Sequence, residues 1–308
     1  MLKKAFTFLA IALLVVFLVG ELVGRYFGLH DYPTHVSSDT FEYIHSPNQD
    51  RTIYGNHFIT NEFSMRSEPI SPEDSLIVLL IGDSVVNGGN LTDHDSLAST
   101  LLEKSLSDEL GQKVRVLNIA AGSWGPDNGM EYVKKYGLFG ADAIVLVFSS
   151  HDAHDNIKLE RSIVDNHPQY FSKNYPLAWG KLAERGWQQV EGRLFKKNKQ
   201  NKIDNSDLGI SEEKDFNAGF AYFRDVAASE NIPLFLYLHA SLEELKKQEL
   251  NDDGLEIVQF SDSNNIQLIT ELETDLKPAD FRDGIHYSDA GQKHLAKELQ
   301  PLLLDVLE

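Results

Sequence analysis

The chain has 308 residues, of which 42% are hydrophobic, and this is enough to bury the core of one sizeable globular domain. Its formal net charge of −19 argues against nucleic acid as a partner and against broad adhesion to anionic lipid head groups. It contains no cysteine, so disulfides, thiolate metal sites and lipid attachment through a leading cysteine are excluded. We expect no cofactor.

An uncharged apolar run from residue 5 to residue 20 follows two lysines at the N-terminus. With the apolar residues after Glu21 it reaches about twenty residues, the length that spans a bilayer. The run is either a secretory signal or a membrane anchor, and the lack of a clear Ala-x-Ala cleavage site favours an anchor over residues 1–25. The lysines should stay in the cytoplasm, which places everything after Arg25 outside it, in the periplasm of a Gram-negative cell. Cleavage would instead give a secreted protein.

Residues 26–74 carry many aromatic and turn residues and alternating runs such as residues 51–60. This composition predicts an ordered lead-in with short strands, not a flexible stalk. Residues 75–308 then alternate strand-like and helix-like patterns, which favours an α/β domain with a mainly parallel, five-stranded sheet between two helical layers.

The strands of this domain are expected where apolar residues are continuous, as in buried parallel strands. These runs are residues 76–81, 114–119, 143–148, 233–238 and 266–269. Helical spacing predicts helices over residues 97–110, 127–136, 211–229 and 290–307. Ser96 is the expected cap of the first of these helices, and Gly111 is expected to end it.

An insertion at about residues 156–209 has no strand pattern. It carries Tyr170, Phe171, Tyr175, Trp179, Trp187 and Phe195, followed by a basic run at residues 196–199. The rings suit stacking on sugars, and the basic run suits an anionic polymer or a membrane partner. A helical cap with its own small core and a solvated lysine run explains the same residues equally well.

Ser84 follows the first apolar strand, and Asp283 and His286 lie just before the last helix. The carboxyl ends of parallel strands are where α/β proteins bind ligands, so we expect Ser84 at that edge. A serine nucleophile needs an imidazole to take its proton, and the imidazole needs a carboxylate to orient it. Asp283 and His286 can supply both groups from one turn. A simple turn and a helix cap would also produce these residues.

These residues resemble the GDSL or SGNH hydrolases, and the resemblance covers roughly residues 75–308. Gly-Asp-Ser at residues 82–84 is similar to the first block of that family, and Asp283 and His286 match its last block in full. The resemblance implies an α/β/α sandwich and ester hydrolysis through an acyl-enzyme on Ser84.

The family's second block runs from an Asn, through four residues, to a Gly whose amide enters the oxyanion hole. Here Asn118 is followed by Gly122 and Ser123, and Ser123 has the spacing of that glycine. We therefore expect the amide of Gly122 or of Ser123 to act beside that of Ser84.

The third block, Gly-x-Asn-Asp, becomes Ser149-Ser150-His151-Asp152, so the resemblance implies that the His151 imidazole replaces the Asn as an oxyanion donor. Losing one such donor costs about 2–4 kcal/mol of transition-state stabilisation. Residues 151–155 hold two histidines and two aspartates, but adjacent ligands would have to converge on one point, so we expect no metal site.

Three further residues are candidates for contact with substrate. Trp124 lies beside the expected oxyanion amide, Asp152 belongs to the third block, and His239 ends a predicted strand. Trp124 filling the core and His239 capping its strand are the alternatives.

The predicted function is removal of O-acetyl groups from an extracytoplasmic polysaccharide, supported by the anchor and the aromatic insertion. Expected partners are an acylated carbohydrate, the membrane and a polysaccharide-export or acetylation machinery. The alternatives are an O-acetyltransferase acting on a glycan, a lysophospholipase or thioesterase, and an inactive glycan-binding or assembly protein. An acyl-length tunnel would favour the lipid enzymes, and a pocket that excludes water would favour transfer.

Overall fold

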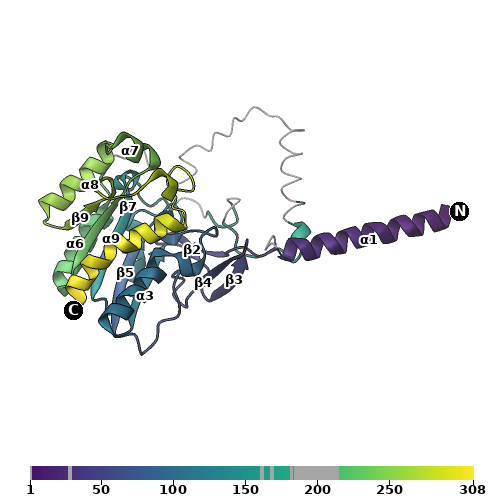
Figure 1. The fold of residues 1–308 in the computed structure, drawn as a ribbon, viewed down its shortest axis with the longest axis horizontal. Helices are drawn as coiled ribbons and strands as arrows, with labels where there is room; N and C mark the ends of the chain where they lie inside the picture. The colour runs from purple at the N-terminus through teal and green to yellow at the C-terminus, as the bar shows by residue number, and fades with distance from the viewer. Residues whose placement is uncertain (1, 27–29, 160–162, 167–169, 181–182, 184–214) are drawn as a thin grey trace.

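The computed structural model describes residues 2–26, 30–159, 163–166, 170–180, 183 and 215–308 (Figure 1). A five-stranded sheet, parallel throughout, lies at its centre in the order β6-β5-β7-β8-β9. The strands are β5 (Leu76–Gly82), β6 (Val114–Ala120), β7 (Ala143–Ser149), β8 (Leu234–His239) and β9 (Gln267–Thr270). Each overlaps a predicted strand, because a strand covered on both faces reads as an unbroken apolar run.

Helices cover both faces of the sheet, which confirms the predicted three-layer sandwich. The described helices of this domain are α2 (Ser84–Asn87), α3 (Ala98–Leu110), α4 (Pro126–Tyr136), α6 (Ala218–Glu230), α7 (Leu242–Lys247), α8 (Asp252–Ser263) and α9 (Asp289–Leu307). One hydrophobic cluster joins the sheet to α3 and α9, and a second joins its other face to α4, α6 and α8. The sheet is therefore buried from both sides.

Helix α3 begins later than predicted. Ser96 does not cap it, because Ser96 closes a short 3-10 turn, η1 (His94–Ser96), and the N-cap residue of α3 is Leu97. The end of α3 is as predicted, since Gly111 adopts a left-handed conformation with φ of 64°.

The helix predicted from residue 211 also starts elsewhere. Residues 211–214 lie outside the described part of the chain, and α6 begins at Ala218. Asn217 caps it, with its side-chain oxygen accepting the Gly219 N–H at 2.8 Å.

Helix α1 (Leu2–Tyr26) extends away from the sandwich (Figure 1). Its mean hydropathy is 2.7, and only 6% of the apolar window is buried in the structure. By length and composition α1 can cross a membrane, although a signal sequence passes the same test.

The lead-in forms two antiparallel hairpins. β1 (His35–Ser38) pairs with β2 (Glu42–His45), and β3 (Gln49–Ile53) pairs with β4 (Asn56–Thr60). Tyr54 and Gly55 turn the second hairpin with φ of 53° and 89°, the backbone twist that suits a two-residue turn. Between the hairpins and the sheet, Phe41 and Tyr43 join the hydrophobic cluster around α4 and α6.

The described part of the insertion contacts the lead-in and the anchor. Phe171 forms a β-bridge with Thr34, and the Tyr170 ring lies 5.0 Å from that of His35. Trp179 stacks on Phe17 and donates its indole N–H to the Phe17 carbonyl at 2.8 Å. Trp187, Phe195 and the basic run at residues 196–199 lie outside the described residues.

Candidate active site

The turn after β5 presents Ser84 at the carboxyl edge of the sheet. A Cβ at Gly82 would lie 2.6 Å from the Val147 carbonyl oxygen of the neighbouring strand, so no larger residue fits there. Asp83 caps α2, because its carboxylate accepts the Val85 N–H at 2.8 Å. Each residue of the Gly-Asp-Ser sequence thus has a separate physical role in placing the hydroxyl.

Ser84, His286 and Asp283 form one hydrogen-bonded chain. The Ser84 Oγ lies 3.0 Å from Nε2 of His286, and Nδ1 of the same ring lies 2.8 Å from Oδ2 of Asp283. The other carboxylate oxygen of Asp283 accepts the N–H groups of Ile285 and His286 at 3.0 and 2.8 Å. In this arrangement an imidazole can take a proton from the hydroxyl while the carboxylate fixes its tautomer.

The Asp283 carboxylate is held in its ionised form. Burial on its own would raise its pKa, but the two backbone N–H groups and the His286 ring outweigh it and lower the pKa of Asp283 to about 2. An ionised Asp283 can stabilise a positive charge on the neighbouring ring.

A buried ion pair supports the turn that carries His286. The His239 ring, at the end of β8, lies 2.7 Å from the Ile285 carbonyl through Nε2 and 2.8 Å from Glu271 through Nδ1. Burial lowers the pKa of His239, but the charge of Glu271 and the hydrogen bonds outweigh it and raise the pKa overall. With an acceptor at each nitrogen, the ring donates both N–H groups as an imidazolium.

Two hydrogen bonds of Gln292 join the last helix to the serine turn. Its side-chain oxygen accepts the Ala98 N–H at 2.9 Å, and its side-chain N–H donates to the Val85 carbonyl at 2.7 Å. Gln292 is buried at the start of α9, a few residues after His286. These two hydrogen bonds fix the start of α9, which follows His286, relative to the turn that carries Ser84.

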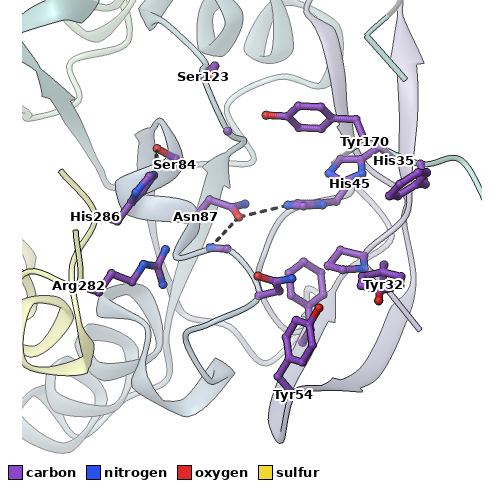
Figure 2. Close-up of a pocket in the computed structure, with 16 residues that line it drawn as sticks. Tyr32, His35, His45, Tyr54, Ser84, Asn87, Ser123, Tyr170, Arg282 and His286 are labelled. Atoms are coloured by element: carbon purple, nitrogen blue, oxygen red, sulfur yellow. Dashed lines mark hydrogen bonds between the residues drawn. The ribbon is translucent and has the colours of Figure 1, made fainter. Parts of the chain in front are cut away.

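A pocket of approximately 400 Å³ opens at Ser84 and His286. Figure 2 shows the pocket between the turns that carry Ser84 and His286 and the lead-in hairpins. Tyr32 and Tyr54 face Ser84 from the opposite wall. The lead-in therefore completes the site.

The backbone of Gly122 and Ser123 lines the same pocket. Ser123 has φ of 54°, a left-handed conformation that favours glycine and explains why the family has glycine at this spacing. Among the described residues, no recorded acceptor takes the N–H of Gly122 or of Ser123. A Cβ on Gly122 would lie 2.9 Å from the Tyr170 hydroxyl oxygen, so that ring packs tightly over the turn.

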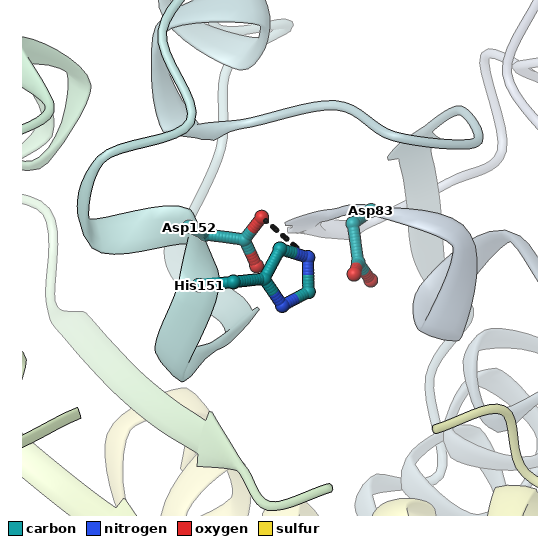
Figure 3. Close-up of side chains that lie close together, drawn as sticks. All are labelled: Asp83, His151 and Asp152. Carbon is teal, nitrogen blue, oxygen red and sulfur yellow. Dashed lines mark ion pairs between the residues drawn. The ribbon is translucent and has the colours of Figure 1, made fainter. Parts of the chain in front are cut away.

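His151 does not line this pocket. Its ring lies between the carboxylates of Asp152 and Asp83, with Nε2 3.4 Å from Oδ1 of Asp152 (Figure 3). No hydrogen bond recorded in the described part of the chain joins His151 to Ser84. An oxyanion donor bonds the substrate oxygen and not the serine hydroxyl, so the role expected of His151 stays a prediction.

The ligand atoms of Asp83, His151 and Asp152 lie within 4.8 Å of one another, close enough to share a cation. One oxygen of each carboxylate is already engaged, in the Asp83 cap and with the Ser149 N–H. Burial, followed by the charge of Asp83, raises the pKa of Asp152, which favours its protonated form.

The three weaker candidates lie away from the pocket. Trp124 is fully buried in the core, and its indole N–H donates to the Tyr43 carbonyl at 2.9 Å. Asp152 is fully buried beneath the sheet edge, and His239 lies under the turn that carries His286. None of these three side chains lines the pocket, so this geometry does not support their direct contact with substrate.

Several residues around the site escaped sequence reasoning. Arg66 is fully buried and donates to the Asn87 and Thr92 carbonyls at 2.7 and 2.9 Å, behind the turn that follows Ser84. The sequence from Asn61 to Arg66 resembles the Asn-x-x-Gly-x-Arg lead-in of many exported relatives, with Ser64 in place of the glycine. Ser64 has φ of 69°, a conformation that favours glycine. Arg282 and Glu271 gave no signal, since only the fold brings them to the site.

Comparison with known proteins agrees with this arrangement. A family model described as GDSL-like Lipase/Acylhydrolase matches residues 78–299, and no curated protein matches the chain. The fold is similar to the lipase/acylhydrolase from Enterococcus faecalis, with 13% identity, a TM-score of 0.44 and coverage of 75% of this chain and 96% of that one.

Two further solved structures are similar. The acetyl xylan esterase AlAXEase has 15% identity and a TM-score of 0.42, covering 74% of this chain and 100% of that one. A two-domain esterase (CEX) active on acetylated mannans has 12% identity and a TM-score of 0.46, covering 76% and 50%. Since the family match spans most of the sequence and includes Ser84, Asp283 and His286, the chain belongs to the GDSL-like lipase/acylhydrolase family of ester hydrolases.

Proposed function

We propose that the protein is a serine esterase in which Ser84 is the nucleophile. The observation that carries the proposal is the hydrogen-bonded chain from Ser84 through His286 to Asp283, which opens into the pocket. In the first step the Ser84 oxygen attacks the ester carbonyl, and His286 takes its proton and passes it to the departing alcohol. Water then attacks the acyl-enzyme, again giving its proton to His286, and regenerates Ser84 as the acid leaves.

The developing oxyanion is proposed to be held by backbone N–H groups. Ser84, Gly122 and Ser123 all line the pocket, and their amides are the proposed donors. Backbone donors of this kind are fixed before the reaction, so they cost no reorganisation when charge develops.

The pocket lining supports a short acyl group on a carbohydrate. The described residues of the lining include no Leu, Ile, Val or Met, so they form no aliphatic tunnel for a fatty acyl chain. The lining has five Tyr or Phe rings, of which Phe58 is fully buried, and exposed rings of this kind offer flat apolar faces to sugars beside polar groups. These rings are Tyr32, Tyr54, Phe58, Tyr170 and Phe171. The proposed substrate is an O-acetylated polysaccharide.

The proposed location is outside the cytoplasm, with α1 as the anchor. Two lysines before the apolar run favour a cytoplasmic N-terminus. In this proposal residues 1–25 anchor the protein, residues 26–74 complete the pocket and residues 75–308 form the catalytic domain.

Hydrolysis of p-nitrophenyl acetate and octanoate by the full-length protein in detergent tests the proposal. We expect turnover of the acetate ester, little of the octanoate, and loss of both in Ser84→Ala, whereas Ser229→Ala on the exposed face of α6 is the matched control. Acetate release from acetylated polysaccharide then tests the substrate class. Acetyl groups that move from the donor to an added glycan acceptor, without free acetate, would indicate transfer. Equal rates for Ser84→Ala and the parent would sink the proposal.

A further inference from the structure

The charge of the pocket differs from that of the molecule. The chain has 47 acidic and 28 Lys or Arg residues, yet the described residues that line the pocket include no Asp or Glu. It does include Arg282, which lies on the same turn as His286 and donates its backbone N–H to the His286 carbonyl at 2.9 Å. Exposed charges more than about 8–10 Å away are largely screened at physiological ionic strength, so an anionic group in the pocket mainly experiences Arg282 in the lining and the ionised Asp283 behind His286.

The Arg282 guanidinium has one edge engaged and one edge open. Its Nη1 donates to the Gly88 carbonyl at 3.1 Å and to the Thr92 hydroxyl at 3.2 Å. No carboxylate in the described part of the chain forms an ion pair with it, and neither Nε nor Nη2 has a recorded hydrogen bond there. In Figure 2 the guanidinium points from the His286 side of the pocket toward the lead-in. The open Nε–Nη2 edge carries two parallel donors, the geometry that matches a carboxylate.

A second cation, Arg66, lies behind residues 87–92, the segment that Arg282 also contacts. Arg66 is fully buried, and its guanidinium stacks on the Phe58 ring at 4.0 Å. Its described partners are carbonyl oxygens, and no described carboxylate pairs with it. Burial, and then the charge of Arg282, lower the pKa of Arg66 to about 9, although the charge of Asp93 raises it. Arg66 and Arg282 thus flank residues 88–92 next to Ser84. Neither forms a direct ion pair with a described carboxylate, although the charge of Asp93 acts on Arg66 and the charges of Asp283 and Asp289 act on Arg282.

We infer that the pocket recognises an acidic sugar: the open edge of Arg282 pairs with the carboxylate of a uronic-acid residue that carries, or adjoins, the acyl ester attacked by Ser84. This deepens the proposed function and rests on it. The aromatic rings of the lead-in pack on the sugar face, Arg282 fixes its orientation, and a neutral sugar leaves the guanidinium desolvated without a partner. Selection follows because an unpaired buried charge costs more than a paired one.

Steady-state kinetics on two acetylated substrates tests this inference. The full-length protein, Arg282→Gln, Arg282→Lys and the control Arg224→Gln, a surface arginine of α6, are compared on an O-acetylated oligogalacturonide and on an acetylated xylo-oligosaccharide. We expect the parent to prefer the acidic substrate in kcat/KM. Arg282→Gln should lower the acidic-to-neutral ratio about ten- to hundredfold, the range for a hydrogen-bonded charge. Arg282→Lys should keep part of the preference, and Arg224→Gln all of it.

Two results would overturn the inference while leaving the esterase intact: no preference for the acidic substrate in the parent, or an equal loss on both substrates in Arg282→Gln. If no hydrolysis depends on Ser84, the proposed function fails and the inference is tested by binding. Calorimetric titration of Ser84→Ala with the oligogalacturonide should then show binding that Arg282→Gln weakens. Equal affinity for the neutral xylo-oligosaccharide, or tighter binding of a sulfated oligosaccharide, would contradict the carboxylate assignment.

Discussion

The turn that carries Asp283 and His286 and the turn at residues 150–155 lie at the same edge of the sheet, and both place a histidine near a carboxylate. Asp283 receives two backbone N–H groups and the His286 ring, and its pKa falls to about 2. Asp152 is fully buried, its recorded hydrogen bond comes from the Ser149 N–H alone, and burial raises its pKa. Burial and the neighbouring carboxylates therefore favour the neutral form of Asp152, whereas two backbone N–H groups and the His286 ring keep Asp283 ionised.

Exchanging the two histidines for glutamine should give the largest contrast. We expect His286→Gln to lower kcat on p-nitrophenyl acetate by about 10⁴-fold or more, because the hydroxyl loses its base. His151→Gln should lower it by less than about tenfold, because His151 is not among the residues that line the pocket. The loss of an oxyanion donor would cost a hundredfold or more. A hundredfold loss in His151→Gln would instead identify that ring as an oxyanion donor.

Asp283→Asn should come next in effect. Removing the charge that orients His286 is expected to lower kcat by up to about 10⁴-fold. The low pKa also means that Asp283 stays ionised, and its stabilising contribution present, until the pH falls below about 4 toward 2. The pH profile of kcat/KM between pH 4 and 9 should therefore show no step from this carboxyl. An acid limb that disappears in Asp283→Asn would contradict this.

The ion pair between His239 and Glu271 should affect stability as well as activity. Glu271→Gln leaves a buried imidazole cation unpaired, which costs about 3–5 kcal/mol. Because the pKa of His239 is raised on folding, its contribution is fully present below pH ~6.5 and is lost as pH rises through the higher folded value. Thermal unfolding from pH 6 to 9 should show this decline in the parent and not in His239→Gln. The same decline in both proteins would show that His239 is not the group that causes it.

Asp155, in the second turn, should give the smallest effect and the opposite sign from Asp283. Burial, and then the charge of Glu42, raise the pKa of Asp155 to about 7. The folded state binds this proton more tightly than the unfolded state does, so stability falls as pH rises from about 4 to about 7. Asp155→Asn should recover on the order of 2–4 kcal/mol at pH 8 and little at pH 4. Asp305→Asn, on the exposed face of α9, is the control, and equal unfolding midpoints at pH 8 would refute the effect.

The sequence predicted the sandwich because its strands are buried on both faces and read as unbroken apolar runs. It did not predict α7, which has only six residues, or α8, whose polar residues outnumber its apolar ones. Ser84, Asp283 and His286 were accessible because their chemistry is tied to local turns. Tyr54 and Arg282 were not, since their roles depend on contacts between segments far apart in the chain, which no local pattern encodes. Arg66 stands in a short recognisable sequence, but its contacts with the turn after Ser84 are likewise set by the fold.

Covalent labelling tests the central claim most directly. The full-length protein, Ser84→Ala and His286→Gln are treated with a serine-reactive fluorophosphonate, and the modified peptide is mapped by mass spectrometry. The account predicts modification of Ser84 in the parent, none in Ser84→Ala and much slower labelling in His286→Gln. No label on Ser84 in the folded parent, or labelling at the same rate without His286, would contradict a nucleophile activated by this histidine.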